Sequence, residues 1–232
     1  MYGVEAFVLA SSDVGEYDRI YSLLTREFGK VRAVARSVRK PKAKLAGHLD
    51  IPNRTWIELV PASKGWQVTQ ALEQESFPGV RQNRPALALL LANAQFMDAF
   101  LHEMRDQKLF GLWERFLLRL TDAPEGDGAI VEFVAAQFKI SALSLFGFLP
   151  DLTVCSGCER EFPDDHAQLF MHGAWCDACS ARQRIQGLRV GVDSLRNAQA
   201  AAAGGLSATE ACAKDMGAIA RHFERQARQY MV

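Results

Sequence analysis

Four of the five cysteines form two Cys-x-x-Cys pairs, and this is the strongest chemical signal in the sequence. Cys155 and Cys158 make the first pair, Cys176 and Cys179 the second, and 17 residues separate the pairs. A two-residue gap lets both sulfurs of one turn reach the same ion, and a second such turn completes a tetrahedron. The spacing therefore predicts one zinc ion. Because a filled shell of four thiolates leaves no position for water or substrate, we expect this zinc to be structural.

Other interpretations of the cysteine region stay open. The pairs could instead be an unmetallated or redox-active dithiol, which would make the protein an enzyme. His166 and His172 lie between the pairs and could replace a cysteine as ligand, although solvent-exposed loop histidines are the commoner case. Gly157 is expected to give the first turn a positive φ. Cys212 stands alone in an Ala-rich segment and is expected only to pack.

No constellation of residues in the sequence calls for catalysis. A zinc deaminase needs His-x-Glu upstream of Pro-Cys-x-x-Cys. Here the run His222–Glu224 lies downstream, and Val154 and Trp175 stand where the prolines should be. The sequence also lacks a Walker A motif, a Gly-x-Ser-x-Gly elbow and a dinucleotide-binding fingerprint. We therefore expect no catalytic residues and a binding protein rather than an enzyme.

A local excess of positive charge is the second signal. The formal net charge of the 232 residues is zero, yet residues 26–44 contain eight basic side chains and one acid, Glu27. Several neighbouring cations can follow a phosphate backbone without a fixed register, so the segment favours nucleic-acid binding over a merely solvated loop. The residues predicted to bind are Lys30, Arg32, Arg36, Arg39, Lys40, Lys42 and Lys44.

Two weaker features also bear on nucleic-acid binding. Aromatic side chains that could stack on bases are sparse near the basic segment, and each is explained equally well as core: Tyr17, Tyr21, Phe28 and Trp56. The last predicted helix carries a basic stripe, which in most proteins is only the solvated side of an amphipathic helix. This stripe consists of Lys214, Arg221, Arg225 and Arg228.

The first 75 or so residues are predicted to be β-rich. A short apolar run at 4–10 and an alternating run at 31–38 each predict a strand, the latter with Val38 on the same side as Arg32, Val34 and Arg36. Residues 55–60 and 66–72 flank a turn and predict a hairpin. Several short strands with turn signals indicate a small barrel. The segment 17–28 fits a helix or a strand.

The rest of the sequence is predicted to be helical around the cysteine region. The first expected helix begins at Pro85, and three more cover 109–120, 130–146 and 192–203. A capping box at Ser207–Glu210 is expected to open the last helix. No apolar run reaches 18 residues, so we expect no membrane span. The N-terminus has no signal-peptide pattern, and we expect a cytosolic protein.

Several sequence strings, taken in order along nearly the whole chain, resemble the RecO family of recombination mediators. The most specific is AVARSVRKP at 33–41. The others are GEYDRI at 15–20, LLTREFGK at 23–30, LAGHL at 45–49, ESFPG at 75–79 and LFGFLP at 145–150. The resemblance implies an α+β protein with an OB-fold barrel at 1–80 and a helical domain at 81–232, into which a zinc finger is inserted at about 152–182. It also implies that the ambiguous segment after Tyr17 is a strand.

The same resemblance implies a function and partners. Members of this family would bind single- and double-stranded DNA, anneal complementary strands and help a recombinase to replace single-strand-binding protein. The partners would be RecR and the C-terminal tail of single-strand-binding protein, in the cytoplasm and at the nucleoid. The alternative left open by the residues is an RNA-binding or ribosome-associated protein with the same barrel and zinc site.

Overall fold

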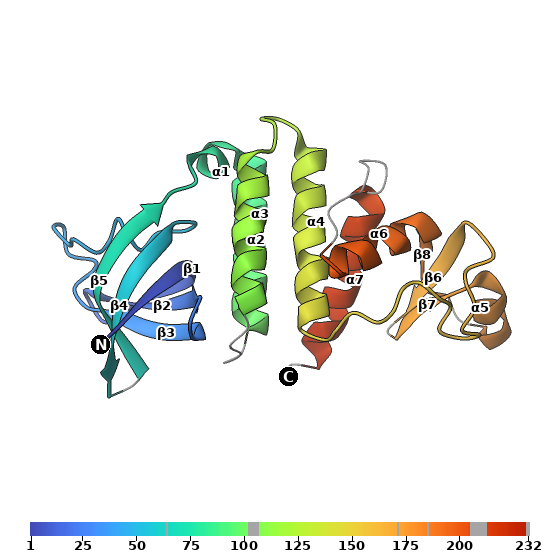
Figure 1. Cartoon of the computed structure of the whole chain (residues 1–232), viewed down its shortest axis with the longest axis horizontal. Coiled ribbons are helices and arrows are strands. Elements are labelled where there is room, and N and C mark those ends of the chain that lie inside the picture. The colour runs from blue at the N-terminus through green and yellow to red at the C-terminus, as the bar shows by residue number, and fades with distance from the viewer. Residues whose placement is uncertain (64, 102–106, 171, 185, 205–212, 231–232) are drawn as a thin grey trace. The chain divides into compact units, whose positions relative to one another are not determined.

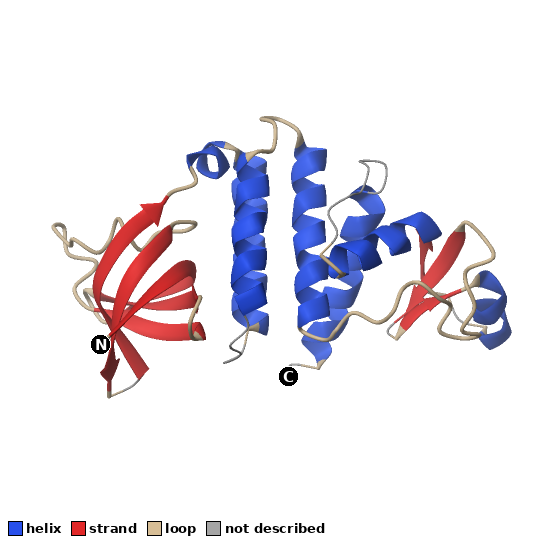
Figure 2. Ribbon diagram, in the orientation of Figure 1, coloured by secondary structure: helices blue, strands red, loops and turns tan. Residues whose placement is uncertain are grey.

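The computed structural model describes residues 1–63, 65–101, 107–170, 172–184, 186–204 and 213–230. The chain divides into two compact units, Met1–Asp122 and Ala123–Val232. Figure 1 labels their helices and strands along the chain, and Figure 2 distinguishes the strand-rich from the helical parts.

The first unit begins with five strands that close into a barrel in the order β1-β2-β3-β5-β4, with β4 paired back onto β1. Strands β3 and β5 are parallel and the other pairs are antiparallel. The bounds are β1 (Tyr2–Val14), β2 (Asp18–Thr25), β3 (Gly29–Ala35), β4 (Arg54–Ala62) and β5 (Gly65–Glu75). This OB-like barrel, followed by helices, confirms the predicted α+β class.

Alternating burial explains why these segments form barrel walls. In β3, Val31, Ala33 and Ala35 are buried in the barrel core, whereas Arg32 between them is exposed. Successive side chains of a strand point to opposite faces, so one face closes the core and the other meets solvent. Residues 18–25 form a strand, as the family resemblance implied, because they pair with both β1 and β3. The predicted β4–β5 hairpin is also confirmed.

The predicted strand at 31–38 is too long at its C-terminal end. Strand β3 ends at Ala35, and Ser37 takes a φ of +56° in the turn that follows. This left-handed residue breaks the two-residue alternation. As a result Val38 is buried in the barrel core, whereas Arg36, predicted to lie on the same side of the strand, is exposed.

Three helices complete the first unit: α1 (Pro78–Gln82), α2 (Arg84–Phe100) and α3 (Gln107–Thr121). Helix α2 begins as predicted near Pro85, because the side chain of Asn83 caps it by accepting a hydrogen bond from the backbone of Ala86 at 3.2 Å. It packs against β1. On the side of β1 away from the barrel core, Phe7 lies 5.0 Å from the ring of Phe110 in α3.

The second unit is a helical body with a small insertion. Helices α4 (Gly128–Leu145), α6 (Val192–Ala202) and α7 (Ala213–Gln229) pack on one another. Between α4 and α6 lie β6 (His166–Phe170), β7 (Gly173–Trp175), α5 (Asp177–Gln183) and β8 (Leu188–Gly191), and the sheet order is β7-β6-β8. The cysteine-bearing insertion between helices is thus confirmed. Strand β8 pairs with β6, so the insertion extends beyond its expected end at about residue 182.

Helix α4 is the most apolar element of the second unit. By length and composition alone it could cross a membrane, with a mean hydropathy of 1.4. However, 56% of that window is buried, and α6 and α7 pack on it, as they would on the core helix of a soluble domain. The predicted capping box at Ser207–Glu210 and the lone Cys212 lie outside the described residues.

Candidate nucleic-acid interface and metal centre

The basic loop, which we define as residues 36–44, is held against the hairpin between β1 and β2. The backbone N–H of Arg39 donates to the carbonyl oxygen of Tyr17 at 3.0 Å. The backbone N–H of Ser37 donates to a carboxylate oxygen of Asp18 at 2.7 Å. These two bonds fix the start of the loop, so its cations have a defined location on the barrel.

Six of the seven cations predicted to bind nucleic acid are exposed: Arg32, Arg36, Arg39, Lys40, Lys42 and Lys44. Within the described part of the chain, no ion pair is formed by Arg32, Arg36, Lys42 or Lys44. An exposed cation without a carboxylate partner can neutralise a phosphate without first breaking an internal contact. The binding role of the seven residues stays a prediction.

Acidic residues from the β1–β2 hairpin lie beside the basic loop, which the sequence does not show because they precede the loop by more than 15 residues. Asp13 is 2.8 Å from Arg19 and 3.4 Å from the Nε of Arg39. Arg39 also donates to the carbonyl oxygen of Glu16 at 3.2 Å. Part of the charge of Arg39 is therefore balanced, and this side chain helps to attach the loop to the hairpin.

Lys30 differs from the other six cations because it joins β3 to α2. Its Nζ lies 2.9 Å from a carboxylate oxygen of Asp98 and donates to the backbone carbonyl of the same residue at 2.5 Å. The hydroxyl of Ser22 donates to that carboxylate at 2.5 Å. Burial alone would raise the pKa of Asp98, but the hydrogen bonds from Ser22 and Lys30 outweigh it and lower the pKa below its ordinary value.

We expect Asp98→Asn to destabilise the first unit by about 1–3 kcal/mol, because the charged partner of Lys30 is lost. A carboxyl group with a lowered pKa in the folded state stabilises the fold above its unfolded pKa of about 3.9, and this stabilisation disappears as pH falls through the folded pKa. We therefore expect the difference in the free energy of unfolding between parent and variant, measured with urea, to be smaller below pH 4 than at pH 7. Asp122→Asn, at an exposed position, is the matched control. An equal difference at both pH values would contradict this account.

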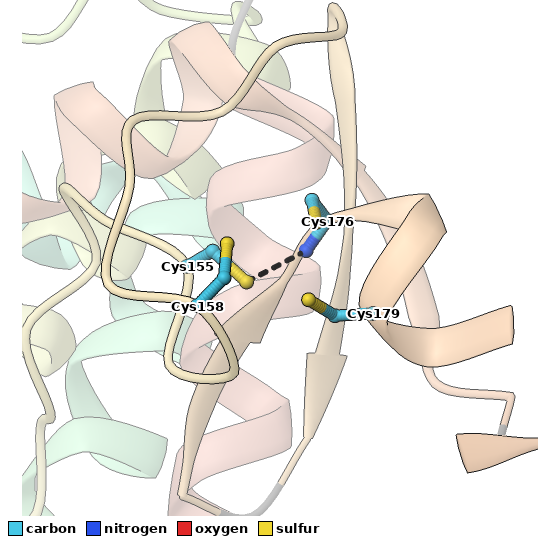
Figure 3. A group of neighbouring side chains, drawn as sticks. All are labelled: Cys155, Cys158, Cys176 and Cys179. Atoms are coloured by element: carbon cyan, nitrogen blue, oxygen red, sulfur yellow. Dashed lines mark hydrogen bonds between the residues drawn. The ribbon is translucent and has the colours of Figure 1, made fainter. Parts of the chain in front are cut away.

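The four paired cysteines meet in the second unit. Their sulfur atoms all lie within 4.8 Å of one another, and Figure 3 shows the two pairs facing each other from separate segments. Cys176 follows β7 and Cys179 lies in the first turn of α5. Four thiolates bound tetrahedrally at about 2.3 Å would lie about 3.8 Å apart, so the cluster fits a metal of that size. The cysteines are thus positioned to bind a metal ion.

The backbone around the cluster also favours thiolate. The sulfur of Cys155 accepts hydrogen bonds from the backbone N–H groups of Cys176 at 3.3 Å and of Gly157 at 3.4 Å. Burial opposes ionisation of Cys155, but these bonds outweigh it and lower its pKa to about 7. Hydrogen bonding to Cys176, together with burial, raises the pKa of Cys179 to about 12. Four adjacent thiols do not ionise together without a cation to balance them.

Two expectations about the cysteine loop are settled by the structure. The predicted positive φ belongs to Glu159, at +60°, and not to Gly157. Glycine is needed at 157 for a different reason, because a Cβ there would lie 3.1 Å from the Cβ of Cys179 and push the pairs apart. His166 and His172 are exposed and are not in the cluster found among the described residues. His172 lies in a turn, whereas His166 is the first residue of β6 and not a loop residue.

The basic stripe of α7 lies on an exposed helix face. Arg221, Arg225 and Arg228 are exposed, while Met216, Ile219 and Phe223 are buried. Arg228 forms an ion pair with Glu224 at 2.8 Å. The side chain of Lys214 lies outside the described residues. This pattern is that of an ordinary amphipathic helix, and of its three exposed arginines Arg221 and Arg225 form no ion pair among the described residues.

Comparisons with known proteins agree with these features. The family model described as "Recombination protein O N terminal" matches residues 1–65, and "Recombination protein O C terminal" matches residues 81–226. The DNA repair protein RecO of Pelobacter propionicus is 30% identical over 184 residues, covering 78% of this chain and 73% of that protein. The DNA repair protein RecO of Myxococcus xanthus is 31% identical over 191 residues, covering 79% and 74%. The chain belongs to the RecO family of DNA repair proteins.

Proposed function

We propose that this protein binds single- and double-stranded DNA through the barrel, anneals complementary strands and helps a recombinase to replace single-strand-binding protein. The observation that carries the proposal is a group of exposed cations on β3 and the basic loop that form no ion pair with any residue the structure describes. Because these cations belong to a small barrel in a family of DNA repair proteins, a DNA backbone is the partner that their charge favours. The group consists of Arg32, Arg36, Lys42 and Lys44.

Annealing requires no catalytic residue, because no covalent bond forms or breaks. Two strands repel each other through their phosphates, and a surface that neutralises part of that charge lowers the barrier to their encounter. We therefore propose a non-enzymatic protein. The four cysteines would hold one zinc ion, which when bound supplies a structural cross-link between the two cysteine pairs.

The proposed partners are RecR and the C-terminal tail of single-strand-binding protein, and the proposed location is the cytoplasm at the nucleoid. The support for these partners is membership of the family. An alternative ligand, structured RNA, would use the same cations, since phosphate contacts carry no base or sugar identity.

An annealing assay tests the proposal directly. Complementary oligonucleotides are each coated with the cognate single-strand-binding protein and mixed with or without this protein, without any nucleotide cofactor. We expect faster duplex formation with the protein, because it would both capture the strands and reduce their repulsion. Structured RNA as competitor should inhibit less than unlabelled single-stranded DNA. No acceleration, or stronger inhibition by the RNA, would refute DNA annealing as the function.

A further inference from the structure

The tip of the β1–β2 hairpin projects from the barrel and is partly apolar. Residues 11–17 are all exposed, and Gly15 makes the turn with a φ of +61°. Val14 and Tyr17 at this tip are 42% and 41% exposed. A single exposed apolar residue needs no explanation. An aromatic side chain beside cations is different, because its ring face can attract a cation.

Two contacts join Tyr17 to the basic loop, one made by its ring and one by its backbone. The Nζ of Lys40 lies 5.2 Å from the centre of the Tyr17 ring, within the range of a cation–π interaction. The carbonyl oxygen of Tyr17 accepts the backbone N–H of Arg39 at 3.0 Å. The ring therefore lies beside Lys40, and the backbone of Tyr17 adjoins the start of the basic loop.

The phenol of Tyr17 keeps its proton at neutral pH. A side-chain hydrogen bond with Glu16 raises the pKa of this phenol above its ordinary value of 10.0. At neutral pH the ring is itself uncharged, and the negative charge beside it is that of the Glu16 carboxylate. The face of a neutral tyrosine can stack on any base, because every base has a π-face.

The other three aromatic candidates of the barrel make different contacts. Trp56 is half-buried, and its ring lies over Gly3, where an added Cβ would be only 2.8 Å from it. Tyr21 is buried, at 1% exposure. Phe28 packs against Tyr2, with ring centres 5.6 Å apart, and against Trp66 at 6.1 Å. Among the described barrel aromatics, Tyr17 is the one that combines exposure with a contact to the basic loop.

We propose that Tyr17 is a base-stacking residue that receives an unpaired nucleobase while the basic loop contacts the adjoining phosphates. This inference rests on the proposed binding of DNA by the loop and extends it. Bases in a duplex already stack on one another, so Tyr17 contributes to binding of single strands and not of duplexes. The hairpin tip would therefore bind unpaired strands more tightly than duplexes, a discrimination that loop cations alone do not supply.

Two substitutions and three nucleic acids test this assignment. Tyr17→Leu removes the ring and keeps an apolar side chain, whereas Tyr17→Phe removes only the hydroxyl. The probes are a mixed-sequence single strand, an abasic single strand of the same length and a blunt duplex. We expect Tyr17→Leu to weaken binding to the base-containing strand by about 5- to 150-fold and to leave binding to the abasic strand and the duplex unchanged. Tyr17→Phe should bind all three as the parent does. The salt dependence should not change, because no cation is removed.

Tyr2→Leu is the matched control, since Tyr2 is 47% exposed but packs with Phe28 and Trp66. It should bind like the parent. The assignment fails if Tyr17→Leu binds the base-containing strand as tightly as the parent does. It also fails if the loss is equal on the abasic strand or equal in Tyr2→Leu. Failure of the underlying function would look different, because the parent protein itself would then show no salt-sensitive binding to any probe.

Discussion

Purified, reduced protein is expected to contain about one zinc ion per chain, bound by the two cysteine pairs. Replacing Cys176 by Ser should remove most of this zinc, because three thiolates bind a tetrahedral ion much more weakly than four. The insertion has only a small apolar core of its own, including the buried Leu152, Leu169 and Ala174. Binding of a structural zinc is worth about 10–16 kcal/mol in comparable small domains at pH 7, so its loss should unfold this part of the second unit.

Metal analysis and hydrogen exchange together measure this effect. In Cys176→Ser, amide protection should be lost across β6, β7 and α5, while the strands of the barrel stay protected. Cys212→Ser is the matched control, since it removes a thiol outside the two pairs. Zinc-free protein from a fresh, reduced preparation would contradict the prediction. Thiol titration would then test the remaining alternative, a redox-active dithiol.

The metal site could be predicted from the sequence because its geometry is mostly local. Each Cys-x-x-Cys pair sits on one turn, so spacing alone brings Cys155 near Cys158 and Cys176 near Cys179. The exposure of Arg32 was predictable for a similar reason, since the alternation along β3 is a property of neighbouring residues. Only the approach of the two pairs to each other depends on the tertiary structure.

The surroundings of the basic loop could not be predicted, because tertiary contacts create them. Asp13, which engages Arg39 of the loop, lies in β1, and Asp98, which engages Lys30 of β3, lies in α2. The segment 18–25 fits a helix or a strand by periodicity, and pairing on both its edges selects the strand. Helix α1 spans only five residues, too few for an apolar period to be recognised.

The unpaired cations of the basic loop should dominate the salt dependence of DNA binding. Each phosphate neutralised on a single strand contributes a slope of roughly −0.7 to the plot of log affinity against log salt concentration. Four contacts from Arg39, Lys40, Lys42 and Lys44 would account for a slope near about −3. The structure indicates a different set of contacts. Arg39 is already engaged by Asp13, whereas Arg36 forms no ion pair among the described residues.

We therefore expect Arg36→Ala/Lys42→Ala/Lys44→Ala to flatten the slope by about 2. Adding Arg39→Ala should change the slope less than a fourth full contact would, because Arg39 already has a carboxylate partner. The loss of affinity should be similar for all sequences, because phosphate contacts carry no base information. Stability should change by less than about 0.5 kcal/mol, as is usual for exposed side chains. The measurement is binding of a mixed-sequence single strand at several salt concentrations.

A matched control removes the same number of exposed cations from the second unit, each without an ion pair in the described part of the chain. It is Arg160→Ala/Arg182→Ala/Arg184→Gly, with glycine at 184 because that residue has a φ of +54°. If binding depended only on total charge, this control and the loop variant would weaken it equally. If the loop is the binding surface, only the loop variant flattens the slope. An unchanged slope in the loop variant would mean that the loop is merely solvated. The exposed Arg221 and Arg225 of α7 would then be the next cations to replace, because they face solvent without an ion pair in the described part of the chain.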